Sequence, residues 1–321
     1  MSTVPCPQIG TRTFAGRDTL LSPAMLVRRP ARNQHWLSSN TNVTYHYLGR
    51  NASHALVKGL GLGNGAEVLF PSFFGPPVVQ APMDAGAAIR FYQVRADLSV
   101  RIEDIRSALT PQARAIYLIH FNGFPGPIDA VMDLARERDL VVIEDSAHAL
   151  LSTIDGRPAG SIGDGGVFSF YKWVPVPNGA AFVANRPLIE AVPPANRRSL
   201  TSGVALSAFS LLDYADRNWG TPGIKLHDSV RALGRQVSRR SSLAYVSTGG
   251  VEFHYDELNY SMSAISHRIM AVQNWDEIVR RRRENYAHLS DLLAHCSPSV
   301  QGELPVGATP LFYATAVADK R

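Results

Sequence analysis

Short apolar runs and amphipathic stretches alternate along the chain from residue 52 onward. The runs with strand-like composition are 67–71, 88–94, 114–120, 140–145, 167–170 and 180–185. Apolar positions recur at helical spacing over 52–60, 100–109 and 128–138. This alternation predicts βαβ units, and therefore an α/β fold in which helices flank a mostly parallel central sheet.

The C-terminal third has a different pattern. The apolar residues of "WDEIVRRRRENYAHLSDLL" (275–293) recur at helical spacing and predict one long amphipathic helix. Its four consecutive arginines, 280–283, fall mostly on the polar side, which favours a solvated or subunit-facing surface; an anionic ligand is the alternative. Residues 187–242 are typical of a connection with some helix, and a strand-like piece, "TPLFYATAVADKR", covers 309–321.

We therefore predict two domains. The large domain covers residues 1–230, including an N-terminal segment over 1–44. The smaller α/β domain covers 231–321.

Composition narrows the class of protein. Of the 321 residues, 45% are hydrophobic and 18% are charged, so the chain has enough apolar material for a large core. No apolar run approaches the ~20 residues that cross a bilayer. The first residues lack a basic segment followed by an apolar one, so we expect a cytoplasmic protein without membrane contact. The net charge is +5, and the only dense run of positive residues is 280–283. We therefore expect no nucleic-acid partner.

Polar residues that could take part in a reaction lie at the end of the apolar run 140–145 and directly after it. The stretch "LVVIEDSAHAL" places Asp145, Ser146 and His148 at the carboxyl end of a predicted parallel strand, where ligands of α/β proteins collect. A structural role for the carboxylates, as caps of the next segment, is the simplest alternative. A metal site with His120 lacks a diagnostic spacing, and a Ser-His-Asp triad lacks its G-x-S-x-G turn, so we expect neither.

Two glycine-containing stretches lie earlier in the chain. "GLGLGNG" (59–65) follows a helical pattern and precedes a strand, the reverse of a dinucleotide fingerprint, so it predicts a helix C-terminus and turn. "YLGRNASHAL" places Gly49, Arg50, Asn51 and Ala52 at the start of an amphipathic helix, whose backbone N–H groups favour a phosphate.

Lys172 lies among aromatic residues in "GVFSFYKWVPVPNGAA" (166–181). A lysine in an apolar site has a lowered pKa, and its neutral amine is a nucleophile toward aldehydes. Taken alone, the pattern around Lys172 agrees equally well with a surface lysine whose aliphatic stem lies on apolar residues and whose ammonium reaches water. Lys172 together with Asp145 and a phosphate-binding helix start favours pyridoxal 5′-phosphate, which uses a lysine and an aspartate partner for its ring nitrogen.

These segments also resemble a known family, taken in the order in which they occur. They are "GLGNGAEVLFPSFF", "AGAAIRFYQV", "LTPQARAIYLIHFNGFPGPID", "VVIEDSAHAL" and "GRPAGSIGDGGVFSFYK". They resemble the DegT/DnrJ/StrS family of pyridoxal-phosphate-dependent aminotransferases, often called sugar aminotransferases. The resemblance is specific over 45–185 and fainter to about 293. It implies the type I aminotransferase fold and a homodimer with shared active sites.

The resemblance also implies roles for particular residues. Lys172 matches the lysine that forms a Schiff base with the cofactor, and Asp145 matches the partner of the pyridinium nitrogen. His148 matches a Gln or His near the phenolic oxygen of the cofactor. The remaining cofactor-binding positions are Ser169 at the phosphate, Arg50, Asn51 and Ala52 in the phosphate loop, Phe73 or Phe74 stacked on the ring, and Asn259.

Three features depart from the family. Only Tyr171 separates the Ser-Phe pair from Lys172, where the family usually has three residues. Arg50 replaces the threonine of the phosphate loop. The C-terminal domain is incomplete relative to the family. We expect a divergent branch with a shortened lysine loop.

The expected activity is ping-pong transfer of an amino group from glutamate or glutamine to a keto acceptor. A nucleotide-linked keto-sugar, or another intermediate of natural-product or polysaccharide biosynthesis, is the expected acceptor. The alternatives are a dehydratase, lyase or cyclase that uses the same cofactor, and a non-catalytic protein of the same fold.

Overall fold

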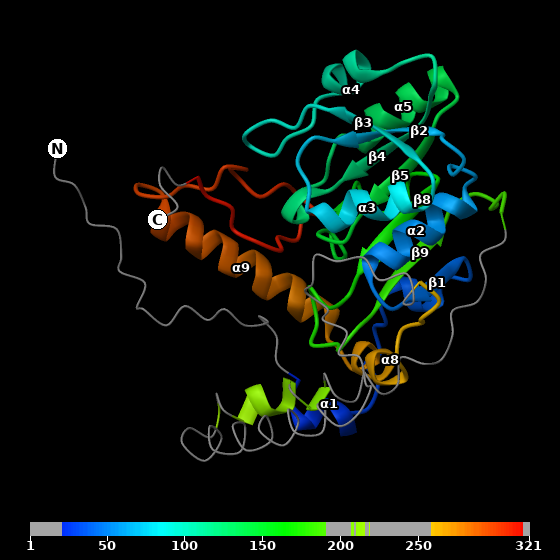
Figure 1. Ribbon diagram of the computed structural model, residues 1–321. Coiled ribbons are helices and arrows are strands. Elements are labelled where there is room, and N and C mark those ends of the chain that lie inside the picture. The colour runs from blue at the N-terminus through cyan, green and yellow to red at the C-terminus, as the bar shows by residue number, and fades with distance from the viewer. Residues whose placement is uncertain (1–20, 191–206, 209, 216–217, 219–257, 317–321) are drawn as a thin grey trace, which may run out of the picture.

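The computed structural model describes residues 21–190, 207–208, 210–215, 218 and 258–316 (Figure 1). A seven-stranded sheet forms its centre. In spatial order its strands are β1 (Val43–His46), β9 (Ala180–Ala184), β8 (Gly165–Ser169), β5 (Val141–Asp145), β4 (Ala113–Ile119), β2 (Glu67–Pro71) and β3 (Ala88–Tyr92). Of these seven, β9 alone runs opposite to its neighbours. The predicted mostly parallel sheet is therefore confirmed.

Helices connect and flank these strands. They are α1 (Pro23–Val27), α2 (Gly49–Gly59), α3 (Pro76–Asp84), α4 (Ile102–Ala108), α5 (Ile128–Arg138), α8 (Ala264–Ala271) and α9 (Trp275–Leu293). Short 3-10 turns cover Trp36–Ser39 and Phe121–Gly123, and β6 (Thr153–Ile154) pairs with β7 (Arg157–Pro158) in a small hairpin. The predicted helices over 52–60, 100–109, 128–138 and 275–293 all form, and 59–65 is a helix end and turn.

The sequence patterns missed two elements of the large sheet region. Helix α3 contains Pro76, Pro77 and Pro82, which argued against a helix; two of them stand in its first turn, where a missing N–H costs nothing. Strand β1 has mostly half-exposed side chains and so lacks a buried run. The strand predicted over 309–321 is wrong for its described part, where residues 309–316 form only one bridge, between Ser299 and Thr315.

Strands β8 and β9 bury both of their faces. Val167 and Phe182 point into a core shared with α2, α4 and α5. Phe168 and Val183 point to the other face, where a second core contains residues of α8, α9 and the turn after β8, among them Trp173. Neighbouring residues of a strand point to opposite faces of the sheet. The second face of β8 and β9 therefore packs against the C-terminal helices α8 and α9. The predicted domain boundary at 230 lies outside the described residues.

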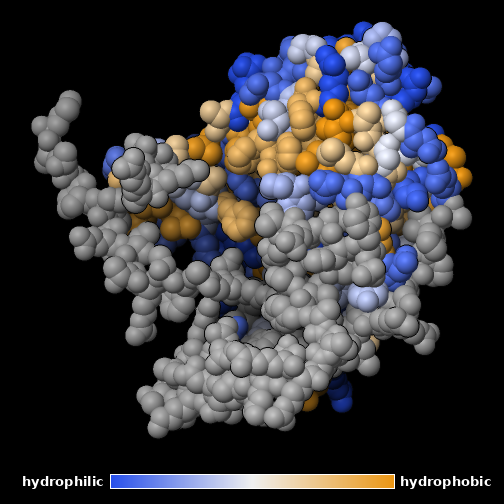
Figure 2. Space-filling view, in the orientation of Figure 1, coloured by the Kyte–Doolittle hydropathy of each residue, from blue (hydrophilic) through white to orange (hydrophobic). Residues whose placement is uncertain are grey.

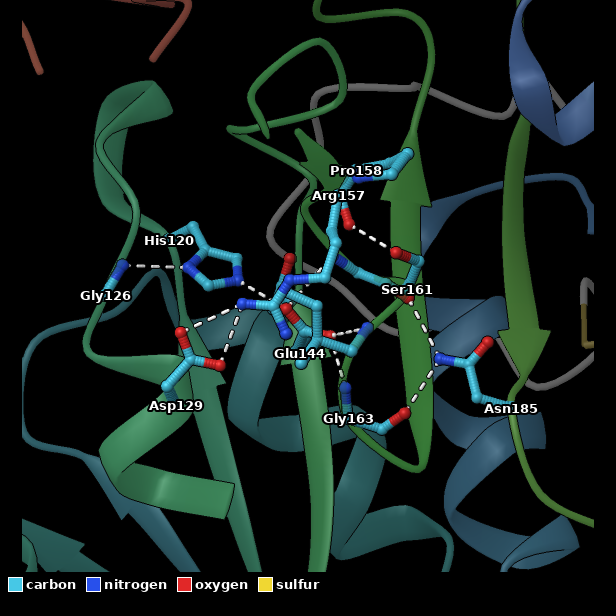
Figure 3. A network of polar contacts seen from close by, with 12 residues as sticks. His120, Gly126, Asp129, Glu144, Arg157, Pro158, Ser161, Gly163 and Asn185 are labelled. Carbon is cyan, nitrogen blue, oxygen red and sulfur yellow. Dashed lines mark hydrogen bonds and ion pairs between the residues drawn. The ribbon is translucent and has the colours of Figure 1, made fainter. Parts of the chain in front are cut away.

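A buried carboxylate fixes the loop between β7 and β8 (Figure 3). Glu144 is inaccessible to solvent, and its two oxygens accept hydrogen bonds from the backbone N–H groups of Gly160, Ile162 and Gly163 at 2.6–3.0 Å. His120 Nε2 lies 2.9 Å from the same carboxylate, while its Nδ1 accepts the N–H of Gly126. Burial by itself raises the pKa of Glu144, but these hydrogen bonds outweigh it and lower the pKa. Glu144 is therefore an ionised structural anchor directly before Asp145.

We expect Glu144→Gln to lower the free energy of unfolding by roughly 3–5 kcal/mol, because the amide NH₂ would face buried donors that now have an acceptor. Urea denaturation followed by tryptophan fluorescence measures the loss. Asp129→Asn is the matched control, since Asp129 pairs with Arg157 at the surface, where both side chains are about half exposed. It should cost about 0–1 kcal/mol. Equal effects of the two substitutions would contradict an anchoring role for Glu144.

Candidate active site

A cavity of about 480 Å³ lies at the carboxyl ends of the parallel strands. Arg50 follows β1, Phe73 and Phe74 follow β2, Asp145 ends β5, Ser169 ends β8 and Lys172 follows it. These residues are far apart in the sequence but meet because parallel strands bring their ends to one edge of the sheet. The predicted location of the site is the location of this cavity.

Asp145 is held by two hydrogen bonds and is buried. Its Oδ1 accepts the N–H of Ala147 at 2.9 Å, and its Oδ2 accepts the hydroxyl of Tyr117 at 3.0 Å. Tyr117 also lies 3.2 Å from the hydroxyl of Ser53. Burial, and next the charge of Asp145, raise the pKa of Tyr117 well above its usual value, so Tyr117 stays protonated and donates. The carboxylate is thus fixed in orientation.

Lys172 stands on the turn between β8 and β9 and lines the cavity. Burial lowers the pKa of its amine, and the charge of Asp145 offsets this in part. The shortened turn therefore still delivers the lysine to the same cavity as Asp145. A surface lysine that merely covers apolar residues does not fit this placement.

The first turn of α2 and Ser169 form one corner of the cavity. No side chain caps the start of α2, and its first turn contains no acidic residue. Ser169 Oγ is buried and has no hydrogen-bond partner among the described residues. It lies close to the helix start, since a Cβ on Gly49 would be 3.8 Å from it. A helix start without an acidic residue, the Ser169 hydroxyl and the nearby Arg50 suit an anion.

His148 also lines the cavity. Burial, and next the charge of Lys172, lower its pKa to about 3, so the ring is neutral at ordinary pH. Its Nδ1 has no hydrogen-bond partner among the described residues. The ring of Phe312 meets it edge-on, with the ring centroids 5.7 Å apart. His148 therefore offers the cavity an uncharged ring.

Not every predicted site residue lies at the cavity. Phe73 and Phe74 both line it, and Phe73 is 56% exposed, whereas Phe74 stacks on Phe91. Asn51 and Ala52 are buried inside α2 and do not line it. Asn259 is exposed and does not line it either. The helix explains the difference for 51 and 52, because residues one and two positions after Arg50 point to other faces.

Tyr117, Ser53 and Phe312 contribute to the site without having been predicted. Tyr117 carries the only hydroxyl among the buried side chains of β4, which was the available signal. Phe312 lies in the C-terminal part of the chain, and its ring contacts His148 at the cavity. Gly123 allows its approach: φ is +93°, and a Cβ there would lie 1.9 Å from the carbonyl oxygen of Thr309.

Within the part of the chain that the structure describes, no group of three His, Cys, Asp or Glu side chains is arranged to hold a metal ion. His120, which the alternative metal site required, is engaged with Glu144 and Gly126. Nor is any helix within the described ranges long and apolar enough to cross a membrane.

The arginines of α9 have two structural uses. Arg280 and Arg281 form ion pairs with Glu277, and Arg280 also pairs with Glu284. Arg282 and Arg283 instead donate to backbone carbonyls of the segment 305–311. The run predicted as a mostly solvated or subunit-facing surface therefore also holds the C-terminal segment in place.

The residues around the cavity fit pyridoxal phosphate. Ser169 Oγ and the start of α2 suit its phosphate, the fixed carboxylate of Asp145 suits a protonated ring nitrogen, and Lys172 supplies an amine of lowered pKa. The fold, a mostly parallel sheet with flanking helices, is that of the type I pyridoxal-phosphate-dependent aminotransferases. The structure is similar to 3-amino-5-hydroxybenzoic acid (AHBA) synthase, with a TM-score of 0.57 and 20% identity over 86% of this chain and 62% of that one.

Sequence comparison then shows a family likeness. Residues 45–190 match the profile of the DegT/DnrJ/EryC1/StrS aminotransferase family, which the motifs of this segment also resemble. A dTDP-4-dehydro-2,3,6-trideoxy-D-glucose 4-aminotransferase of Saccharopolyspora spinosa is 32% identical over 200 residues, covering 61% of this chain and 51% of the relative. The GDP-perosamine synthase of Vibrio cholerae is 30% identical over 44% of this chain and 39% of its own length. The chain thus spans about half the length of these relatives or less.

Proposed function

We propose that the protein is a pyridoxal-phosphate-dependent aminotransferase that moves an amino group from glutamate or glutamine to the keto group of a nucleotide-linked sugar. The observation that carries this proposal is the convergence of Lys172, Asp145 and Ser169 on one cavity. Two relatives that are 32% and 30% identical to the chain have names that refer to dTDP- and GDP-linked sugars.

In this proposal the cofactor supplies an electron-accepting ring that stabilises negative charge on the carbon bearing the amino group. Asp145 would hold the ring nitrogen of the bound cofactor and favour its protonated form. Tyr117 and the N–H of Ala147 hold the carboxylate in that orientation. The Lys172 amine, with its lowered pKa, is the group that takes a proton from the donor carbon and returns one. Neutral His148 adds no competing charge.

A homodimer is part of the proposal. Large apolar side chains stay about half exposed on and beside α3: Phe73 at the cavity, Met83, and Phe91 on β3. Figure 2 shows apolar residues gathered on one face of the molecule, beneath a more hydrophilic region. Monomeric proteins seldom expose large contiguous apolar surfaces, so a second copy that covers this region would complete the site.

Absorbance spectroscopy tests the proposed function. The purified protein is mixed with pyridoxal phosphate, and spectra are recorded before and after glutamate and then after each member of a panel of nucleotide-linked keto-sugars. We expect glutamate to shift the visible band with formation of 2-oxoglutarate, and one acceptor to reverse the shift.

Other outcomes would contradict it. Ammonia release without keto-acid formation would indicate a dehydratase, lyase or cyclase, for which the shortened lysine turn was the motive. A protein whose added pyridoxal phosphate shows only the spectrum of the free cofactor would be a non-catalytic member of the fold.

A further inference from the structure

Backbone hydrogen bonds hold the turn that carries Lys172. Phe170 continues the β8–β9 hairpin by donating to Gly179, and its carbonyl accepts the N–H groups of Trp173 and Val174 at 2.9 and 3.0 Å. One helical turn therefore presents Lys172 and Trp173 in succession. Lys172 lines the cavity, whereas Trp173 is fully buried in the second core. The turn therefore joins Lys172, a cavity residue, directly to Trp173, a residue of the second core.

Trp173 makes a direct link to the other half of the site. Its indole N–H donates to the carbonyl oxygen of Ala147 at 3.0 Å. Ala147 is also the residue whose N–H binds Asp145, and it immediately precedes His148. A single tryptophan therefore ties the lysine turn to the segment that carries the aspartate and the histidine.

Arg282 of α9 holds the other side of Trp173. Its guanidinium carbon lies 4.7 Å from the centroid of the indole ring, a cation–π contact. The same guanidinium donates to the carbonyl oxygen of Leu311 at 3.2 Å, and Leu311 precedes the Phe312 ring that meets His148. Arg282 is thus placed between the lysine turn and the C-terminal segment, and it contacts both.

We propose that Arg282 is a positioning residue for Lys172, acting through Trp173, and that this contact sets the amine in the cavity despite the shortened turn. The proposal rests on the proposed function for its catalytic consequence only. A guanidinium suits this task because its flat face can lie over the indole ring while its N–H groups donate in fixed directions to carbonyls; a lysine ammonium has no flat face and no fixed donor directions.

The consequence can be measured on the amine itself. The other charged or titratable side chains that line the cavity with Lys172 are Arg50, Tyr117, Tyr171, Asp145 and His148. If the turn moves when Arg282 is replaced, Lys172 gains water, and its pKa and reactivity shift toward those of an exposed lysine.

Competitive labelling with acetic anhydride tests the proposal on the full chain without cofactor. Mass spectrometry follows the acetylation of Lys172 as a function of pH, and exposed Lys58 on α2 is the internal standard. We expect the Lys172 titration midpoint in Arg282→Gln to move up toward that of Lys58. In the loaded enzyme we expect kcat to fall about 10–100-fold with little change in KM, because the amine is misplaced rather than the substrate.

Arg281→Gln is the matched control, since Arg281 lies one residue earlier, is exposed and pairs with Glu277. It should leave both readouts at the wild-type value. Arg282→Lys should recover only part of the loss. If Arg282→Gln does not fold, Arg282→Lys and Trp173→Phe, which removes the N–H to Ala147, provide the same comparison.

An unchanged Lys172 titration in the folded Arg282 variants would overturn the inference. The proposed function fails separately: a labelling shift in a protein that never responds to amino donors would overturn transamination and leave the positioning role standing.

Discussion

Replacing Lys172 by alanine is expected to abolish transamination. The Lys172 amine is the group of lowered pKa that shares the cavity with Asp145, and the proposal assigns the proton transfer to it. Loss of a positioned general base costs about 10²–10⁴-fold in rate, and loss of the lysine also removes the group to which the cofactor would be attached. A coupled assay for 2-oxoglutarate measures the rate.

A second readout for Lys172→Ala does not depend on turnover. Borohydride reduction of the wild-type protein with pyridoxal phosphate should leave a pyridoxyl group on the peptide that contains Lys172, and none on that peptide in the variant. Lys58→Ala is the control, because Lys58 is exposed near the C-terminal end of α2 and should behave as wild type. Equal labelling and activity in Lys172→Ala would show that another residue performs this role.

Asp145→Asn is expected to lower kcat by roughly 10²–10³-fold, the usual cost of removing one preorganised electrostatic contact at a reacting group. The variant keeps the size of the side chain but loses the charge that, in the proposed function, would favour a protonated ring nitrogen on the cofactor. It also places an NH₂ group where Tyr117 or Ala147 now donates to a carboxylate oxygen. Steady-state kinetics with glutamate measure the loss.

Tyr117→Phe distinguishes charge from orientation at Asp145. It keeps the carboxylate and removes one hydrogen bond of 3.0 Å to it, so we expect a loss of about 10-fold or less, consistent with ~1 kcal/mol for such a bond. If Tyr117→Phe were as damaging as Asp145→Asn, orientation rather than charge would be the main contribution of the carboxylate.

The strands of the parallel sheet were predictable because each is a short apolar run bounded by polar or turn residues. Strands β2, β4, β5, β8 and β9 form within two residues of the predicted bounds. Strand β1 and helix α3 were not predictable, since the first has no buried run and the second contains three prolines. Local pattern thus succeeded where burial follows the sequence and failed where tertiary contacts override propensity.

The candidate site divided in the same way. Lys172, Asp145, His148 and Ser169 were predicted at one edge of the sheet, because the ends of parallel strands meet there and strand ends can be located in a sequence; all four line the cavity. Asn51, Ala52 and Asn259 were carried over by position alone, and the structure places them away from the cavity. Side-chain direction on a helix depends on rotation about its axis, which position in a motif does not specify.

By itself, the sequence determined the class of fold and the edge of the sheet where the candidate site lies, since these follow from hydrophobic periodicity and from residue types at strand ends. Only the tertiary structure decided which groups support that chemistry. Tyr117 at Asp145, Trp173 at Ala147 and Arg282 on Trp173 join residues 26 to 109 positions apart. No local pattern encodes such contacts, because they arise when separate elements pack into a common core.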